Sequence, residues 1–280
     1  MSGRLTLCAT PIGNLEDTSH RAIRVLGEAD AVACEDPRRL RKLLTHFGIH
    51  AKDLIVYNEG NERRRAPELV RRVQRGEWIV LASDAGMPGI SDPGYRLVTE
   101  SIEKGIEIDV VPGPNAAVSA LVLSGLPTAR FAFEGFLPRK AGERSKRIEQ
   151  VAGETRTLIF YVSPHHAAET ARALLDGLGD RSAALARELT KLHEEVLREG
   201  LRALATRLES EPPKGEMVLV VEGAPEEAGE PGDEELAAMA RALMKEGLAR
   251  SEALSSVAKR CGVPRRRVFD ALLKDPGAGS

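Results

Sequence analysis

Five short apolar runs alternate with amphipathic segments along the first 111 residues. Apolar runs of this length, bounded by turn residues, predict buried strands, and strands that alternate with helices predict a largely parallel sheet with helices on both faces. The predicted strands are 5–9, 31–34, 54–57, 78–82 and 106–111, and the predicted helices are 18–28 with Thr18 as N-cap, 38–46, 67–75 and 94–104.

The same alternation continues after Pro114 and predicts a second α/β unit. Its predicted strands are 131–133, 157–161, 182–186 and 217–221, its predicted helices are 115–124, 144–150 and 164–175, and 196–209 is mixed and mainly helical. We therefore expect an α/β protein with an N-terminal α/β domain over 1–114 and a C-terminal α/β domain over 115–223.

The pattern changes in the last sixty residues. Residues 222–235 hold seven acidic and no basic side chains among Gly and Pro, which is typical of a solvated linker, here placed at 224–234. Residues 235–280 read as helical, and 255–273 has the helix, Gly-containing turn and helix of a helix-turn-helix. Eight Lys and Arg against three acidic residues over 245–274 make this a basic, RNA-binding candidate on a chain whose net charge is −2.

Composition narrows the class of protein. A chain of 280 residues suggests about two large domains at roughly 150 residues each. Cys8, Cys34 and Cys261 form no C-x-x-C pair, so we expect a reduced, cytoplasmic protein without a zinc site. No apolar run reaches the length of a membrane span or of a cleaved signal peptide, so we expect no membrane association.

The loop over 83–94 is the strongest candidate for chemistry. It places three Gly, two Pro and two Asp directly after a predicted strand, where open α/β sheets bind ligands. Two further strand-end loops, 10–14 and 112–115, belong to the same predicted sheet. None of the three is a G-x-G-x-x-G or a P-loop, so neither NAD nor ATP is the obvious ligand.

Several of these residues also have plain structural interpretations. Asp36 and Arg38 could equally form an ion pair at the start of a helix without any role in a site. Asp84 and Asp92 could equally cap turns or helices. The spacing of His165, His166 and His193 fits no zinc motif, so we predict no metal. The arginines at 63–65, 71, 72 and 75 form either a solvated helix face or a phosphate contact.

The motifs taken together resemble the small-subunit ribosomal RNA methyltransferases of the tetrapyrrole methylase class. The resemblance runs from about Leu5 to Gly223, and the helix-turn-helix segment also matches. It is carried by seven blocks in order, namely residues 9–15, 35–38, 83–94, 111–114, 125–128, 133–140 and 187–194.

The resemblance implies fold, cofactor and partners. Two α/β domains of the tetrapyrrole methylase type would face each other across a cleft that binds S-adenosylmethionine, in a protein that forms a homodimer. The implied reaction methylates the ribose 2′-hydroxyl of a decoding-site cytidine in 16S rRNA of the small ribosomal subunit. The implied cofactor contacts are Pro11, Asp84, Gly86, Met87, Asn115, Ala116, Tyr161, Val162, Leu189 and Met217.

The implied chemistry needs an in-line attack and a group that helps the hydroxyl lose its proton. Candidates for that region are Glu35, Asp36, Glu188 and Lys191, although a lysine acts as a base only if its pKa is depressed. Phosphate contacts are expected from Arg38, Arg139, Lys140, Arg144 and Arg187.

One block departs from the family pattern. Val162 and His166 stand where this class is expected to carry Glu and Arg. If the Glu and Arg hold the substrate, this chain holds it differently; if they pair with each other, their joint loss is nearly neutral.

Two other functions remain open. One is methylation of a different acceptor, such as a corrin or siroheme precursor or the modified histidine of elongation factor 2. The other is a nucleic-acid-binding protein built on the helix-turn-helix.

Overall fold

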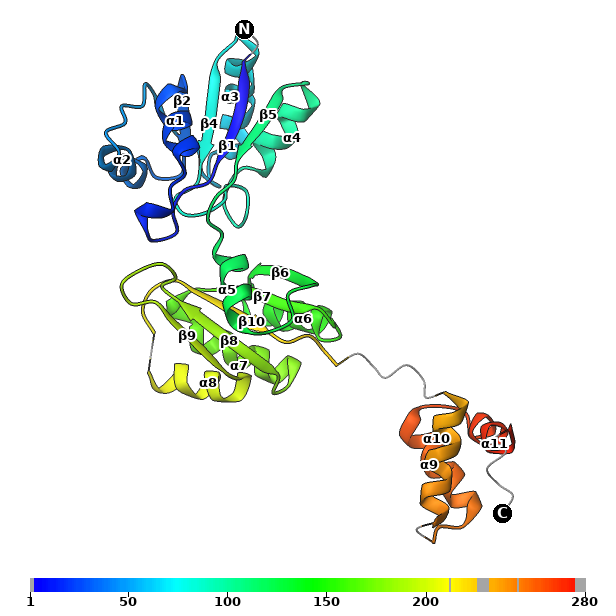
Figure 1. The fold of residues 1–280 in the computed structure, drawn as a ribbon. Helices are drawn as coiled ribbons and strands as arrows, with labels where there is room; N and C mark the ends of the chain where they lie inside the picture. The colour runs from blue at the N-terminus through cyan, green and yellow to red at the C-terminus, as the bar shows by residue number, and fades with distance from the viewer. Residues whose placement is uncertain (1–2, 212, 226–231, 246, 275–280) are drawn as a thin grey trace. The chain divides into compact units, whose positions relative to one another are not determined.

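The computed structural model describes residues 3–211, 213–225, 232–245 and 247–274. The chain divides into two compact units, Met1–Ala224 and Pro225–Ser280, and each is described by itself (Figure 1). Within the described residues no helix is long and apolar enough to cross a membrane.

The first sheet of unit one is fully parallel. Its order is β3-β2-β4-β1-β5. Successive β4 side chains enter different cores, Ile79 and Leu81 on one face and Val80 and Ala82 on the other, so both faces need a cover of helices. The strands are β1 (Arg4–Cys8), β2 (Ala31–Cys34), β3 (Leu54–Val56), β4 (Trp78–Ala82) and β5 (Glu107–Val111).

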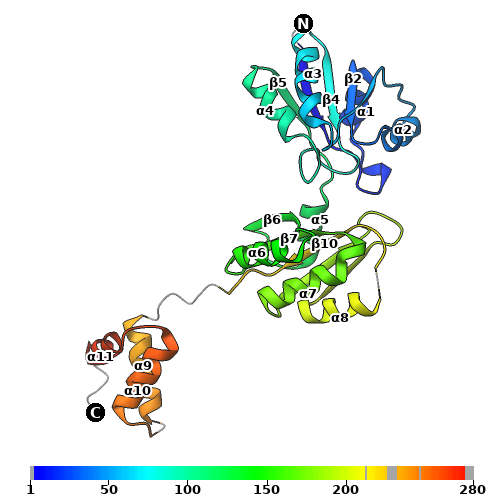
Figure 2. The same ribbon diagram turned by 180° about the vertical axis from the view of Figure 1, so that it is seen from behind.

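Two helices pack on each face of this sheet, as predicted (Figures 1 and 2). One face is covered by α1 (His20–Glu28) and α2 (Pro37–His46), the other by α3 (Glu62–Gln74) and α4 (Tyr95–Glu103).

Two helices that cover the first sheet start two or more residues away from the predicted position. The cap of α1 is Ser19, whose hydroxyl accepts from the Ala22 N–H, because residues 15–17 form a 3-10 turn that displaces the helix start from Thr18. Helix α3 begins at Glu62 and carries Pro67 in its interior. An interior proline removes one helical hydrogen bond and crowds a carbonyl of the preceding turn. The buried packing of Ala66 and Leu69 on either side of Pro67 keeps the helix continuous through it.

The second sheet mixes strand directions in the order β6-β7-β10-β8-β9. Only β6 and β7 are parallel, and the other neighbours are antiparallel. Helix α5 (Ala116–Ser124) packs on one face, and α6 (Ala141–Val151), α7 (Ala167–Leu178) and α8 (Leu201–Ser210) on the other. The strands are β6 (Phe131–Phe136), β7 (Thr157–Val162), β8 (Ser182–Arg187), β9 (Glu195–Gly200) and β10 (Met217–Val221).

The prediction for residues 196–209 was wrong in its first part, because β9 precedes α8. Strand β9 lies at the edge of the sheet with no fully buried residue, and three of its six side chains are charged. An edge strand of this kind lacks the apolar run that identified the buried strands.

The second unit is a three-helix assembly, with α9 (Asp233–Lys245), α10 (Arg250–Cys261) and α11 (Arg265–Lys274) around one apolar core. Gly262 ends α10 in the left-handed conformation at φ 65°, and the turn to α11 completes the predicted helix-turn-helix. Residues 226–231 of the predicted acidic linker, and residues 246 and 275–280 of the predicted helical segment, lie outside the described residues.

A close contact joins the two sheets within unit one. The Asn14 N–H donates to Thr190 Oγ1 at 3.0 Å, and Ile12 enters the core beneath α5. Gly13 is so close to the opposing loop that a Cβ on it would lie 2.5 Å from Lys191 Cγ and 2.9 Å from the Leu189 carbonyl oxygen. Only glycine allows the two loops to approach this closely.

We expect Gly13→Ala to force these loops apart and to lower the free energy of unfolding by about 1–3 kcal/mol, as overpacking does. Chemical denaturation measures the change. Gly27→Ala is the matched control, since its Cβ would meet only ordinary contact at 3.5 Å inside α1 and alanine favours the helix. Equal stability of Gly13→Ala and wild type would show that the loops yield without cost.

Candidate active site

The three strand-end loops meet at the carboxyl edge of the first sheet. Thr10 and Gly86 pair through both backbone hydrogen bonds, at 2.9 and 3.0 Å, and Thr10 Oγ1 donates to the Ser83 carbonyl. A Cβ on Gly86 would lie 3.4 Å from the Pro114 carbonyl oxygen, which brings the third loop against the second. The expectation that these loops share one edge is therefore confirmed.

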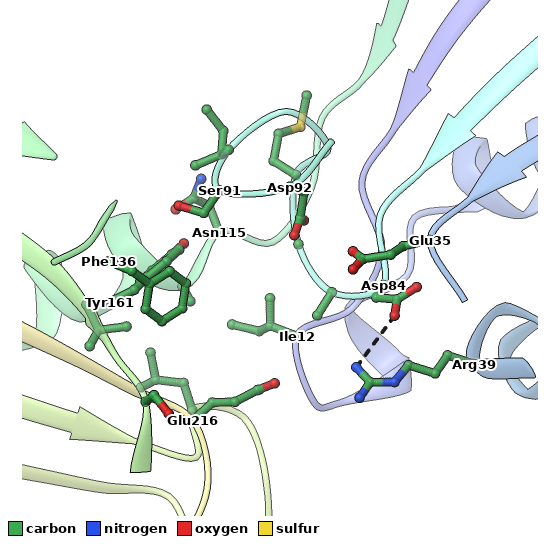
Figure 3. Close-up of a pocket in the computed structure, with 18 of the residues that line it drawn as sticks. Ile12, Glu35, Arg39, Asp84, Ser91, Asp92, Asn115, Phe136, Tyr161 and Glu216 are labelled. Carbon is green, nitrogen blue, oxygen red and sulfur yellow. Dashed lines mark ion pairs between the residues drawn. The ribbon is translucent and has the colours of Figure 1, made fainter. Parts of the chain in front are cut away.

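A cavity of about 820 Å³ opens beside these loops and reaches the second sheet (Figure 3). This volume lies within the range of small-molecule sites. Twelve of the predicted site residues line it: Glu35, Asp36, Arg38, Asp84, Gly86, Met87, Asn115, Ala116, Tyr161, Val162, Leu189 and Met217. Lining residues that were not predicted include Ile12, Arg39, Asn58, Ser91, Asp92, Phe136, Ala186, Glu216 and Val218.

The start of α5 forms one wall of the cavity. The Asn115 side chain caps the helix by accepting from the Val118 N–H at 3.1 Å, and Asn115 and Ala116 both line the cavity. The N-terminal end of a helix carries partial positive charge and N–H groups, so this wall suits a carboxylate.

The opposite wall is acidic. Asp84 accepts from the Asp36 N–H at 3.0 Å and pairs with Arg39 at 3.6 Å, which links the loops after β2 and β4. Five carboxylates and two guanidinium groups line the cavity as a whole. This excess of negative charge favours a cationic ligand.

The lining carboxylates differ in pKa. Hydrogen bonds from Arg38 lower the pKa of Asp36 to about 2, so Asp36 stays ionised. Burial raises the pKa of Glu35, and the nearby Asp84 charge raises it further. Burial, followed by the charges of Glu35, Asp84 and Glu216, raises the pKa of Asp92 to about 7.

Glu188 and Lys191, which were predicted as catalytic candidates, lie beside the cavity. Lys191 Nζ donates to Glu188 at 2.9 Å and to the lining residue Glu216 at 3.0 Å. Burial lowers the pKa of Lys191, but its two carboxylate partners outweigh burial and leave that pKa raised. A raised pKa is the opposite of what a lysine base needs.

The predicted phosphate contacts lie in different surroundings. Arg38 is exposed at the cavity and pairs with Asp36, whereas Arg187 pairs with Glu195 at 2.9 Å. Arg144 is only 7% exposed and donates to Glu169 and to the Arg139 carbonyl, so its guanidinium joins α6 to α7. Outside the cavity lining lie Pro11, Arg139, Lys140, Arg144 and Arg187.

The two positions that depart from the family pattern are separated in the structure. Val162 ends β7, is buried beside Met217 and adds to the apolar wall of the cavity. His166 is outside the cavity lining and pairs with Glu169 at 3.4 Å.

Comparison with known proteins agrees with this geometry. The sequence model of the tetrapyrrole (corrin/porphyrin) methylases matches residues 4–205. A relative from Halalkalibacterium halodurans, named ribosomal RNA small subunit methyltransferase I, is 45% identical over 273 residues, which are 96% of this chain and 94% of the relative. A relative of the same name from Thermotoga maritima is 42% identical over 221 residues, which are 79% of this chain and 99% of the relative.

Solved structures share the fold. Diphthine synthase aligns with a TM-score of 0.60 and 16% identity over 78% of this chain and 89% of that one. Uroporphyrin-III C-methyltransferase from Thermus thermophilus, in complex with S-adenosylhomocysteine, aligns with a TM-score of 0.55 and 23% identity. The alignment covers 78% of this chain and 97% of that one.

Fold and cavity together define an S-adenosylmethionine-dependent methyltransferase of the tetrapyrrole methylase class. Within that class, the chain belongs to the ribosomal RNA small subunit methyltransferase I family.

The cavity fits this cofactor. Its acidic wall around Asp84 suits the ammonium and sulfonium charges, and the start of α5 suits the carboxylate. The apolar side chains of Val162, Leu189 and Met217 offer a surface for the adenine ring.

We expect Asp84→Ala to weaken S-adenosylmethionine binding by about tenfold or more. The substitution removes a shielded negative charge that attracts the cationic ligand, and tenfold in affinity corresponds to about 1.4 kcal/mol of binding free energy. Isothermal titration calorimetry measures the affinity. Asp84→Asn is the matched variant, because its amide oxygen can still accept from the Asp36 N–H without the charge. If both variants bind the cofactor like wild type, Asp84 serves the loop and not the ligand.

Proposed function

We propose that this chain transfers the methyl group of S-adenosylmethionine to the ribose 2′-hydroxyl of a decoding-site cytidine in 16S rRNA of the small ribosomal subunit. The observation that carries the proposal is the identity of 45% with a ribosomal RNA small subunit methyltransferase I over 273 residues, which are 96% of the chain. A cytoplasmic location follows from this substrate, and we extend the proposal to a homodimer.

The cofactor and the cavity residues have different roles in the proposed methyl transfer. S-adenosylmethionine, when bound, supplies an electrophilic methyl group on a sulfonium that is already a good leaving group. The chain must therefore position the acceptor hydroxyl in line and take up its proton. Arg38 is the predicted phosphate contact that lies at the cavity, and its exposed guanidinium can meet the RNA backbone there. Asp36 remains ionised beside Arg38 and orients it through two hydrogen bonds.

The second unit supplies a surface that suits RNA. Arg250, Arg265 and Arg266 line a groove with the half-exposed ring of Phe269, and the Arg250 guanidinium lies 5.5 Å from that ring. Guanidinium groups bind phosphates, and an exposed aromatic ring stacks an unpaired base. The Thermotoga maritima relative matches 221 residues, which is close to the 224 residues of the first unit. This supports the proposal that the first unit carries the reaction and the second unit contributes to RNA binding.

The direct test is methyl transfer from labelled S-adenosylmethionine to small ribosomal subunits and to naked 16S rRNA. We expect one methyl group per RNA, located on a 2′-oxygen of a decoding-site cytidine by alkaline-hydrolysis resistance and mass spectrometry. Transfer to a tetrapyrrole but not to RNA would contradict the proposal and favour the alternative acceptor. Binding of RNA without transfer to any acceptor would favour the nucleic-acid-binding alternative.

For the second unit we expect the double variant Arg265→Gln, Phe269→Leu in the full chain to weaken RNA binding by about tenfold or more, since one stacked base alone is worth about 1–3 kcal/mol. Cofactor affinity should not change. Fluorescence anisotropy with RNA at two salt concentrations measures the loss and its smaller salt slope. Arg24→Gln on α1 is the charge-matched control. Unchanged RNA affinity in the double variant would show that this groove does not contact RNA.

A further inference from the structure

The second aspartate of the 83–94 loop projects into the cavity from the end nearest the second sheet (Figure 3). The loop comes close to the second sheet there. Ser91, the residue before Asp92, has a φ of 60°, and a Cβ on Gly135 of β6 would lie 3.3 Å from Ser91 Oγ. Asp92 therefore lies where the loop of the first sheet meets a strand of the second.

The carboxylate of Asp92 differs from three of the four other lining carboxylates in having no hydrogen-bond or ion-pair partner among the described residues. Asp84 pairs with Arg39, and Asp36 with Arg38. Glu216 is bound by Lys191. Among the described residues, Asp92 makes neither a hydrogen bond nor an ion pair, although it is half-buried.

Glu35 is the other lining carboxylate without such a partner among the described residues. Its side chain is more exposed than that of Asp92, and it lies after β2 on the first sheet alone. Figure 3 shows both carboxylates directed into the same part of the cavity, with Asp92 on the side of Tyr161 and Phe136. Asp92 thus combines shielding from solvent with access to the cavity.

We propose that Asp92 is the general base that accepts the proton of the ribose 2′-hydroxyl during methyl transfer. This inference rests on the proposed function. In the step, the O–H bond breaks and the proton moves to the Asp92 carboxylate while the oxygen forms its bond to the methyl carbon. The electron pair of the broken carbon–sulfur bond stays on sulfur, and Asp92 later releases the proton to water.

The electrostatic surroundings of Asp92 match this role. Burial raises the pKa of Asp92 to about 7, and the charges of Glu35, Asp84 and Glu216 contribute in that order. Tyr161 faces Asp92 from β7, and burial together with that carboxylate raises the pKa of its phenol. A base is most effective when its pKa lies near the working pH, because it is then both available and strong enough.

The first test is the pH profile of kcat/KM for RNA methylation. In wild type, kcat/KM should rise as the pH rises through about 7, which gives the profile an ascending limb. Asp92→Asn should lose roughly 100-fold or more of kcat, and the pH profile of its residual activity should lack the ascending limb. Asp92→Glu keeps a carboxylate and should retain the limb at reduced rate. Asp176→Asn, which removes an exposed carboxylate from α7, should match wild type. A limb near pH 7 that persists in Asp92→Asn would overturn the proposal.

The second test needs no substrate. A carboxylate whose pKa is raised in the folded state favours folding at low pH, and that contribution is lost as the pH rises from about 4 to about 7. The Tm of Asp92→Asn relative to wild type should therefore increase from pH 4 to pH 8, whereas that of Asp176→Asn should not. A Tm difference that does not change with pH would show that Asp92 is not perturbed and would overturn the proposal.

The two tests separate this inference from the proposed function. If wild type methylates no RNA, the proposed function fails, and the Tm series still reports the state of Asp92. If wild type methylates RNA and Asp92→Asn does so equally well, the proposed function stands and only the role of Asp92 as general base is wrong.

Discussion

The fit of the turn at Gly13 and Asn14 against Leu189, Thr190 and Lys191 is the constraint on which the cavity depends. The two sheets have no common hydrogen-bonded strands, so close approaches between their loops, such as this one, bring their edges together. Phe136, Tyr161 and Met217 of the second sheet line the same cavity as the loops of the first. The contact also restricts position 13 to glycine, because a methyl group there would occupy space that Lys191 and Thr190 already fill.

Much of the fold was predictable, because buried strands and two-sided helical cover leave a local pattern. The apolar runs at 78–82 and 217–221 are strands with those bounds. The edge strand Glu195–Gly200 was missed because its stability comes from pairing with β8 and not from its own apolar content. Helix α3 was shortened in prediction because Pro67 was taken as its start, although tertiary packing of Ala66 and Leu69 keeps the helix continuous through it.

The candidate site was predictable where it lies in the loops and less so where it depends on packing between sheets. The loop motif over 83–94 contains both Asp84 and Asp92, but no pattern in the sequence reveals that Asp92 lacks a partner while Asp84 has Arg39. The burial of Arg144 depends on Glu169, which lies one helix further along the chain. Glu216 enters the cavity because β10 runs antiparallel to its neighbours, and strand direction is not readable from an apolar run.

The excess of carboxylates over guanidinium groups in the cavity bears on turnover as well as on binding. Methyl transfer converts a positively charged sulfonium into a neutral thioether. Since Coulomb attraction scales with the ligand's charge, a negative enclosure holds the spent cofactor less firmly than the fresh one. The negative lining that suits S-adenosylmethionine therefore also favours exchange of the neutral product for a new cofactor.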